Sequence, residues 1–280
     1  MHKPWVEKYR PEYLKDVICP PPQLEDIINK GALDFPNLLF VGAYGVGKTT
    51  MAYVLENELK AELWKPAERT IDTVREMPSF INKLTKSTMK LILLDEADKF
   101  TPPAQNKLRE VMELQGDTRF ILTTNHINEI IPAIQSRCTL ISFNTIILNE
   151  YKNRLKYISQ EENVNISDTV LDKIVSENFP DFRRGINALF LFHTTGKYVT
   201  SVDLVEHIVS LVLSKDIKEI RRVLVNQAIV DYESLLVGLF DYFFEKDNKE
   251  NALVIYRGLV NHVVVAEPLV NFLATCMALK

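Results

Sequence analysis

The stretch FVGAYGVGKTT, residues 40–50, constrains the fold of this chain more than any other segment. It places three glycines within six positions and follows them with a lysine and two threonines. Glycine loses the most backbone freedom on folding, so such a cluster is unfavourable unless the backbone itself has a task. LLFV (38–41) is typical of a short buried strand, and residues 48–60 space apolar side chains along one face of a helix.

The residues from Gly42 to Thr49 fit the pattern G-x-x-x-x-G-K-[ST] in the strand–loop–helix context that this motif requires. In such a loop, backbone N–H groups surround phosphate oxygens, and the N-terminus of the following helix adds a partial positive charge. Lys48 is expected to reach the β- and γ-phosphates of ATP, and the Thr49 hydroxyl to bind Mg²⁺. The alternative is a glycine turn that happens to precede a lysine. The predicted nucleotide-binding residues of this segment are Gly42, Ala43, Tyr44, Gly45, Val46, Gly47, Lys48, Thr49 and Thr50.

The segment KLILLDEAD, residues 90–98, supplies the acidic groups that a nucleotide hydrolase needs beside such a loop. Its apolar residues predict a buried strand, and Asp95 and Glu96 follow directly. Asp95 is expected to hold Mg²⁺ through water, and Glu96 to orient and deprotonate the attacking water. The alternative is a strand that ends in solvated acids.

Further apolar segments alternate with predicted helices, which favours a parallel sheet with both faces covered. The additional predicted strands are 61–64, 119–125 and 139–143. Ligands of such sheets bind beyond the carboxyl ends of the strands, where Lys48, Asp95 and Asn125 all fall. Asn125 is expected to hydrogen-bond the γ-phosphate or the attacking water, although an isolated asparagine often caps a turn.

Composition limits the class of protein. The chain has 280 residues, of which 46% are hydrophobic and 25% charged, as is ordinary for a soluble globular protein. No apolar run approaches a membrane span, and the N-terminus lacks a signal-peptide pattern, so a cytoplasmic location is expected (the host cytoplasm if the protein is viral). The three cysteines are far apart, which disfavours a disulfide framework or a zinc site. A net charge of −4 argues against general nucleic-acid binding but not against a local basic patch.

Four further segments carry a resemblance to a known family: PWVEKYRP (4–11), ELWKPAERTIDTVRE (62–76), IQSRC (134–138) and FPDFRRGIN (179–187). With the two nucleotide motifs, the chain resembles the AAA+ small ATPase subunits of sliding-clamp loaders of the replication factor C type. The short chain and the NFPDFR run look closest to the bacteriophage members. The sequence departs from the family in the loop, where Ala43 and Tyr44 replace the usual Pro-Pro or Ser-Pro; this is expected to alter loop rigidity rather than phosphate binding.

The resemblance implies roles for several residues. Asn125 matches a position that senses nucleotide, and Arg183, rather than the adjacent Arg184, matches an arginine that reaches the γ-phosphate. Arg137 matches an arginine finger that enters the neighbouring subunit's site, although by itself it reads as a surface arginine. The residues expected to line the adenine pocket are Val6, Tyr9, Arg10, Pro11, Val17 and Ile18; without the resemblance, they read as an N-terminal segment packed on the domain.

The resemblance also implies DNA contacts around the helix that Pro102 and Pro103 begin. The residues expected to face DNA are Arg75 and Lys83 on the preceding helix, then Gln105, Lys107 and Arg109. Gln105 resembles a relay between the DNA surface and Glu96. Contacts to phosphates position a protein without reading sequence. The alternative for each basic residue is a solvated side chain.

The expected architecture is an α/β P-loop AAA+ core with a parallel sheet (1–147), a small helical lid (148–203) and an all-α C-terminal collar for oligomerisation (204–280). The expected function is that of a clamp-loader ATPase subunit, with ATP and Mg²⁺ as cofactors. The expected partners are the other subunits of a hetero-oligomeric ring, which we expect to be a pentamer with several copies of this chain, a sliding clamp and primer-template DNA. Alternatives are another AAA+ ATPase, such as a helicase loader or a branch-migration motor, and a scaffold subunit that does not hydrolyse nucleotide.

Overall fold

The computed structural model describes residues 3–29, 35–83, 87, 89–114, 117–144, 146–198, 200–226, 232–262 and 267–279. The chain folds into two compact units, residues 1–197 and 198–280. The nucleotide motifs and most of the segment predicted as the lid belong to the first unit. The second unit holds the whole of the predicted collar.

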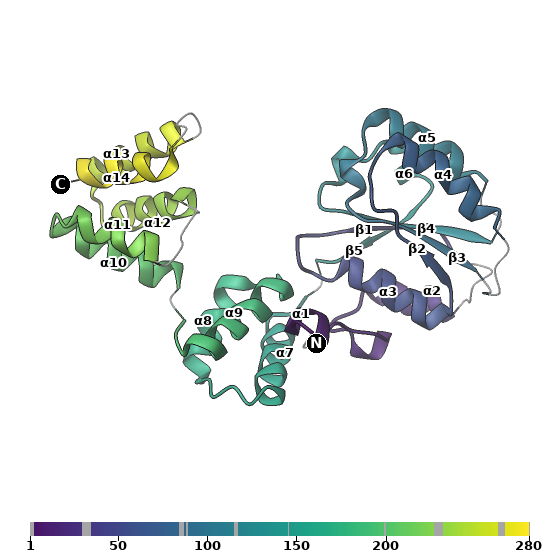
Figure 1. The fold of residues 1–280 in the computed structure, drawn as a ribbon, viewed down its shortest axis with the longest axis horizontal. Helices are drawn as coiled ribbons and strands as arrows, with labels where there is room; N and C mark the ends of the chain where they lie inside the picture. The colour runs from purple at the N-terminus through teal and green to yellow at the C-terminus, as the bar shows by residue number, and fades with distance from the viewer. Residues whose placement is uncertain are drawn as a thin grey trace. The chain divides into compact units, whose positions relative to one another are not determined.

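A five-stranded parallel sheet forms the centre of the first unit, as the sequence predicts (Figure 1). Its strands are β1 (Leu38–Val41), β2 (Glu62–Trp64), β3 (Lys90–Leu94), β4 (Thr118–Thr124) and β5 (Thr139–Ser142). They are ordered β2-β3-β4-β1-β5, and every neighbouring pair is parallel. All carboxyl ends therefore meet at one edge of the sheet.

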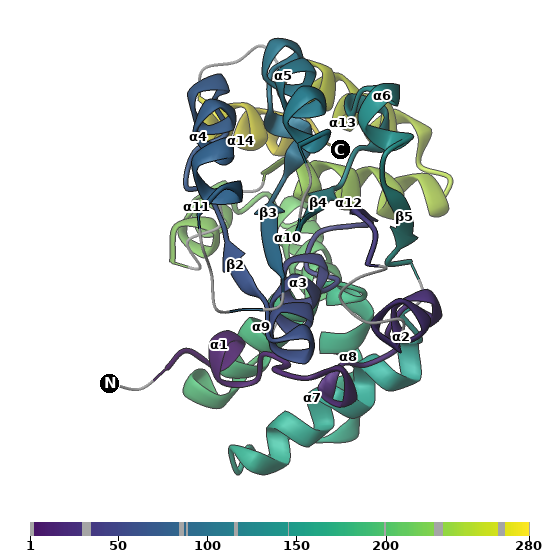
Figure 2. The same ribbon diagram turned by 90° about the vertical axis from the view of Figure 1, so that its right-hand side faces the viewer.

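Helices cover both faces of this sheet (Figures 1 and 2). One face packs on α2 (Pro22–Asn29) and α3 (Lys48–Leu59), and the other on α4 (Ile71–Ile81), α5 (Pro102–Met112) and α6 (Pro132–Gln135). Alternate strand residues serve the two faces: Leu38 faces α3, whereas Leu39 belongs to the core under α5. Each such fully buried side chain stabilises the fold by about 1.5–3 kcal/mol.

Two details at the helix ends differ from the sequence-based expectation. The helix predicted over 48–60 ends at Leu59, because Lys60 adopts a left-handed conformation with φ of 50°. The apolar residues of 99–115 also predict a helix face that includes Leu114, but this side chain is 56% exposed because α5 ends at Met112.

The helical part of the first unit begins after β5. It contains α7 (Leu148–Glu161), α8 (Asp168–Asn178) and α9 (Phe182–Thr195). The sequence offers Ser167 or Asp168 as the cap of α8, and in the structure it is Ser167, whose hydroxyl accepts a hydrogen bond from the Val170 N–H. The N-terminal helix α1 (Trp5–Lys8) packs on α9, where the rings of Trp5 and Phe190 lie 5.1 Å apart. Three short 3-10 helices, Leu14–Asp16, Ala97–Lys99 and Ile127–Glu129, also belong to the unit.

The second unit is helical, with its own apolar core that includes Ile208, Leu236 and Phe272. Its helices are α10 (Ser201–Leu213), α11 (Ile217–Asn226), α12 (Tyr232–Glu245), α13 (Lys249–His262) and α14 (Pro268–Ala278) (Figure 1). Among the helices that the structure describes in the whole chain, none combines the length and hydropathy needed to cross a bilayer.

Candidate nucleotide-binding site

The glycine-rich loop joins the end of β1 to the start of α3. Gly45 and Gly47 have φ values of 69° and 97°, a region that side chains with a Cβ rarely adopt. The Lys48 ammonium folds back across this loop and donates hydrogen bonds to the carbonyls of Gly42 (2.8 Å) and Ala43 (2.6 Å). It also donates to the Asn125 side-chain oxygen (2.7 Å), which joins the loop to the end of β4.

Lys48 carries its positive charge in a largely buried position. Burial lowers the pKa of Lys48 to about 8, although Asp95 and Asp98 nearby oppose the shift. An anion at the loop would favour the charged ammonium and raise this pKa again. The charged form of Lys48 is therefore stabilised most when a phosphate group is bound at the loop.

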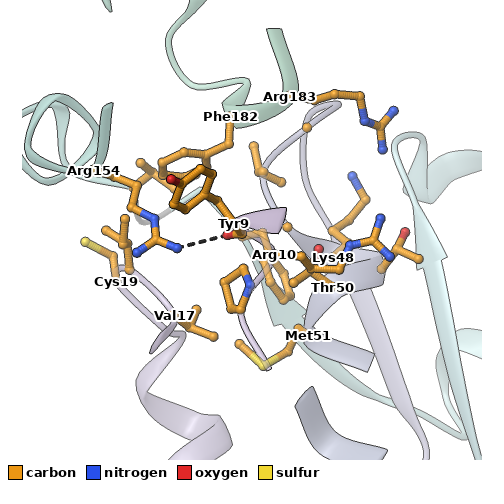
Figure 3. A pocket seen from close by; sticks show the side chains of 18 of the residues that line it. Tyr9, Arg10, Val17, Cys19, Lys48, Thr50, Met51, Arg154, Phe182 and Arg183 are labelled. Atoms are coloured by element: carbon orange, nitrogen blue, oxygen red, sulfur yellow. Dashed lines mark hydrogen bonds between the residues drawn. The ribbon is translucent and has the colours of Figure 1, made fainter. Parts of the chain in front are cut away.

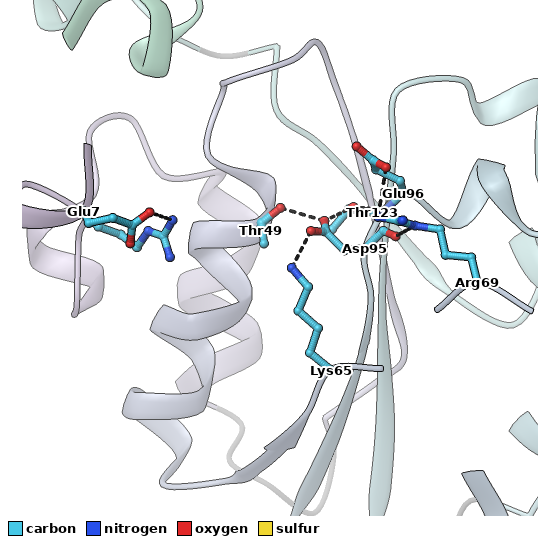
Figure 4. Close-up of polar contacts among 8 residues, drawn as sticks. Glu7, Thr49, Lys65, Arg69, Asp95, Glu96 and Thr123 are labelled. Carbon is cyan, nitrogen blue, oxygen red and sulfur yellow. Dashed lines mark hydrogen bonds and ion pairs between the residues drawn. The ribbon is translucent and has the colours of Figure 1, made fainter. Parts of the chain in front are cut away.

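The first acid of the DEAD segment is held by three side chains (Figure 4). Asp95 Oδ1 accepts hydrogen bonds from the hydroxyls of Thr49 (2.7 Å) and Thr123 (2.8 Å), and Oδ2 pairs with the Lys65 ammonium (2.7 Å). Burial opposes ionisation of Asp95, but the hydrogen bonds from Lys65, Thr49 and Thr123 outweigh it, so the pKa of Asp95 lies below its usual value.

The second acid is restrained by an arginine that the sequence analysis did not single out. Glu96 has a φ of 54°, and its carboxylate pairs with the Arg69 guanidinium at 3.0 Å. Arg69 Nε also donates to the Asp95 carbonyl at 2.9 Å, so one guanidinium spans both acidic residues (Figure 4). The Glu96 side chain is 44% exposed, which leaves its carboxylate accessible to water.

The oxygen groups of Thr49 and Asp95 suit a magnesium ion. Mg²⁺ in phosphate-binding sites typically uses one or two protein oxygens and completes its shell with phosphates and water. The Thr49 hydroxyl and the Asp95 carboxylate lie within 2.7 Å of each other at the mouth of the loop. Among the described residues, no group of three or more His, Cys, Asp or Glu forms an alternative metal site.

A cavity extends from the loop between the N-terminal segment and α9 (Figure 3). All six residues predicted for the adenine pocket line it, together with Arg183 and the loop from residue 45 to residue 50. Gly42, Ala43 and Tyr44 do not line it; two of them bind Lys48 through carbonyls, and Tyr44 is 57% exposed. Residues that the sequence analysis missed also line the cavity: Cys19, Pro21, Met51, Phe143, Ile146, Arg154, Phe182 and Ile186.

Hydrogen bonds fix the N-terminal segment over this cavity. The Arg154 guanidinium of α7 donates to the Tyr9 carbonyl at 2.9 Å (Figure 3). The Tyr9 hydroxyl and the Lys8 ammonium both donate to Glu162, each at 2.7 Å. Arg154 follows a strand by twelve residues and carries no motif, so only the folded arrangement reveals its place.

Helix α9 touches the phosphate loop directly. The Phe182 N–H donates to the Gly45 carbonyl at 3.1 Å, and Asp181 caps α9 by accepting from the Arg184 N–H. A Cβ on Gly45 would lie 1.8 Å from the Asp181 carboxylate, so only glycine permits this approach. Of the two adjacent arginines, Arg183 lines the cavity; its contact with a γ-phosphate stays a prediction.

Arg137 lies at the opposite edge of the sheet from the cavity. Its backbone carbonyl accepts from Asn37, which precedes β1, and its guanidinium binds Glu113 (2.8 Å) and the Ala133 carbonyl (2.7 Å). Strands rise about 3.3 Å per residue, so Gly42 begins the loop about 16 Å beyond Asn37. An arginine side chain does not span that distance, and Arg137 cannot complete the site of its own chain.

The residues predicted to face DNA are not equivalent in the structure. Gln105 is 3% exposed, and its side chain binds the backbones of Phe100, Glu129 and Ile131. Gln105 is therefore enclosed by protein and braces α5 internally, and its role as a relay between the DNA surface and Glu96 stays a prediction. Lys83 lies two residues beyond the end of α4 rather than on that helix.

The remaining predicted DNA contacts are more accessible. Arg75 on α4 pairs with Asp72, and Lys107 on α5 pairs with Glu110, both in exposed positions. Arg109, also on α5, is half-buried. Exposed ion pairs are weak, so a phosphate can take over either basic side chain at low cost.

Comparison with protein families gives two adjacent matches. The family described as "ATPase family associated with various cellular activities (AAA)" matches residues 38–145. The family described as "Sliding-clamp-loader large subunit, AAA+ ATPase lid domain" matches residues 145–202. The two matches meet between β5 and α7.

Curated relatives cover most of the chain. Replication factor C small subunit 2 of Pyrobaculum arsenaticum is 40% identical over 211 residues, which is 70% of this chain and 65% of that protein. Replication factor C small subunit of Methanococcus maripaludis is 35% identical over 254 residues, which is 85% of this chain and 80% of that protein. The chain thus spans slightly under two thirds of the first relative's length and four fifths of the second's.

Solved structures share the fold. The Thermotoga maritima RuvB Holliday junction branch migration motor aligns with a TM-score of 0.54 at 16% identity, over 65% of this chain and 64% of that chain. Identity this low shows the fold alone. It therefore does not favour a branch-migration motor over the family to which the sequence relatives belong.

Proposed function

The chain belongs to the replication factor C small-subunit family of clamp-loader AAA ATPases, and from that premise we propose how it works: it binds ATP with Mg²⁺ and hydrolyses it within a ring of subunits that loads a sliding clamp onto primer-template DNA. One observation carries this proposal. A phosphate loop, two acids and a polar sensor converge at one sheet edge, beside a cavity that an N-terminal segment closes.

The side chains divide the work of hydrolysis. Lys48 neutralises charge on the β- and γ-phosphates, and its bond to Asn125 is exchanged for phosphate oxygen when nucleotide enters. Glu96 takes a proton from the attacking water, and Asn125 orients that water or the γ-phosphate. Arg183 adds positive charge from α9. Mg²⁺, held by Thr49 and through water by Asp95, supplies further neutralisation of phosphate charge.

Arg137 serves a neighbouring copy in this proposal. Because Arg137 lies at the far edge of the sheet, it does not reach the nucleotide site of its own chain. Its planar, permanently charged guanidinium suits a transferring phosphoryl group in the site of a neighbouring copy. In the isolated chain, Glu113 holds the guanidinium. Ring assembly therefore exchanges a surface ion pair for a contact with the adjacent nucleotide.

The DNA-facing surface is proposed to include Arg75, Lys83, Lys107 and Arg109. Such phosphate contacts make binding weaken with salt and independent of sequence. Arg69 binds Glu96 and precedes α4, the helix that carries Arg75, by two residues. Contact of Arg69 with a DNA phosphate would release Glu96 for its role as base.

ATPase measurements on the chain co-purified with its partner subunits test the proposal. Hydrolysis should rise when the clamp and primed template are both added, and Glu96→Gln should remove that rise while leaving ATP binding intact. Asp172→Asn in the lid is a matched control that removes an exposed carboxylate far from the cavity. Turnover that ignores clamp and template would favour another AAA+ role, and unchanged hydrolysis in Glu96→Gln would refute the site.

A further inference from the structure

Lys65 reaches the acidic site from the short strand β2. The register of β2 on β3 pairs Trp64 with Ile92, so Lys65 emerges at the carboxyl edge one strand away from Asp95. Its ammonium lies 2.7 Å from Asp95 Oδ2 (Figure 4). No nucleotide motif includes Lys65, and none of the roles proposed above uses it.

The contacts of Asp95 show which of its oxygens a cation can use. Oδ1 accepts from the hydroxyls of Thr49 and Thr123, which are part of the loop helix and of β4. Oδ2 has the Lys65 ammonium as its partner. A divalent ion beside the Thr49 hydroxyl would face a carboxylate whose other oxygen, Oδ2, is already paired with the Lys65 cation. Lys65 therefore neutralises the carboxylate charge that would attract such an ion.

We propose that Lys65 is an internal counter-ion, a positioning residue that neutralises Asp95 in the nucleotide-free chain and must leave Oδ2 before Mg²⁺–nucleotide can be held. The proposal rests on the function proposed above, because it assumes that Asp95 faces the metal. Lys65 keeps the free chain from capturing a divalent ion without nucleotide. When nucleotide and metal bind together, their combined interactions with the site are stronger than the Lys65–Asp95 ion pair.

The surroundings of Lys65 allow its side chain to move away from Asp95. Its ammonium lies 6.0 Å from the centroid of the Tyr53 ring, at the outer limit of a cation–π contact. Arg10 approaches the same ring at 5.6 Å. The Lys65 side chain is 36% exposed, so rotation toward Tyr53 or into solvent requires no repacking of the core. The Asp95 side chain, at 18%, is less exposed than its partner and remains in place.

Another ion pair of the chain provides a comparison. Lys152 pairs with Asp172 in the lid, and its exposure of 32% is similar to that of Lys65. Asp172, however, is 57% exposed and has no part in the nucleotide cavity. Removing Lys152 thus deletes a similar ion pair without changing the charge at the metal site.

Manganese titration of the full-length chain without nucleotide, followed by electron paramagnetic resonance of free Mn²⁺, tests the proposal. Lys65→Met should bind Mn²⁺ roughly two- to fivefold more tightly than wild type, the range that a partly exposed ion pair is worth. Lys65→Arg should restore the wild-type affinity, and Lys152→Met should not change it. Lys65→Gln, which keeps polarity, serves as a second neutral variant should Lys65→Met melt at a lower temperature.

The outcomes separate this inference from the proposed function. Equal or weaker Mn²⁺ binding in both neutral Lys65 variants overturns the counter-ion role, even if metal binding itself is intact. Asp95→Asn should abolish the gain that ADP confers on Mn²⁺ binding. If Asp95→Asn retains that gain, the proposed metal site is wrong, whatever the Lys65 variants do.

Discussion

A single chain brings together most groups of the nucleotide cavity. It does not do so for the surface formed by α5, α6 and the residues that directly follow them, here called the α5–α6 surface. Around the cavity, Lys48 at the start of α3 already binds Asn125 after β4, and the neighbouring Thr49 binds Asp95 after β3. On the α5–α6 surface, Arg137 and Lys107 pair with nearby glutamates. The first region is a site that folding assembles. The second holds charges whose proposed partners are other molecules, so it is the one that depends on assembly.

Of the changes predicted here, removal of Arg137 should have the largest effect on turnover. A small effect would contradict the contrast between the two regions. Arg137→Ala is expected to lower assembly-stimulated turnover by roughly a thousandfold, the lower range for loss of an arginine finger. ATP affinity of the isolated chain should not change, because Arg137 is remote from its own cavity. Turnover by the assembled ring and equilibrium ATP binding by the free chain measure the two quantities. Weakened ATP binding in the free chain would mean that Arg137 acts within its own site.

Nucleotide affinity measured over a series of pH values tests the role of Lys48 in the cavity. Burial lowers the pKa of Lys48 to about 8, and bound phosphate should raise it. Below pH 8 the free ammonium is charged and affinity is constant; above it, free Lys48 loses its proton, so nucleotide affinity should fall about tenfold per pH unit until the bound-state pKa is reached. Calorimetry near pH 9 in buffers of different ionisation enthalpy should show proton uptake on binding. Proton release would contradict the assigned sign.

Arg69 binds both acids of the nucleotide site and offers a sharper test of the proposed connection between DNA and Glu96. Arg69→Ala frees the Glu96 carboxylate from its ion pair, so hydrolysis without DNA should rise by roughly fivefold, the upper value of an exposed ion pair. DNA stimulation should shrink in the same variant. Arg222→Ala, which removes an exposed arginine that pairs with Glu219 and has no proposed role at the site or on DNA, is the matched control. A fall in DNA-independent hydrolysis would show that Arg69 supports the reaction instead of restraining it.

Replacement of Glu113 should have the smallest effect on stimulated turnover. Glu113→Gln removes the partner that holds the Arg137 guanidinium, and both side chains are substantially exposed, so the ion pair is worth about 0.4 kcal/mol or less, toward the lower end of the range for exposed pairs. Stimulated turnover should therefore rise about twofold or less. Titration of ring assembly against turnover can resolve this change. A large loss of turnover would indicate that Glu113 positions Arg137 for its neighbour.

Sequence reasoning succeeded where a motif and a strand end coincide. The loop glycines and Asp95 are fixed by short patterns whose structural context follows from the parallel sheet. Lys65 and Arg69 escaped because their roles depend on how the three-residue strand β2 aligns with β3, which no local pattern specifies. The rule that ligands gather at carboxyl strand ends places Lys65 at the right edge of the sheet, but it does not pair Lys65 with Asp95.

Gln105 combines a pattern and a resemblance. Its spacing from Leu108 and Met112, three and seven residues along α5, already places it on the buried face of that helix. Its role as a relay to Glu96 comes from the family resemblance alone and stays a prediction. The residues predicted for the adenine pocket could not be derived from pattern at all, because their convergence on one cavity requires the N-terminal segment to fold over it beside α9.

Complementation between two inactive variants tests the central claim, that each site is finished by its neighbour, most directly. Glu96→Gln keeps the finger and lacks the base, whereas Arg137→Ala keeps the base and lacks the finger. Each ring built from one variant should be inactive, and rings from an equal mixture should regain about a quarter of wild-type stimulated turnover, since one neighbour arrangement in four unites both groups. A mixture no more active than the two variants measured separately would contradict the claim.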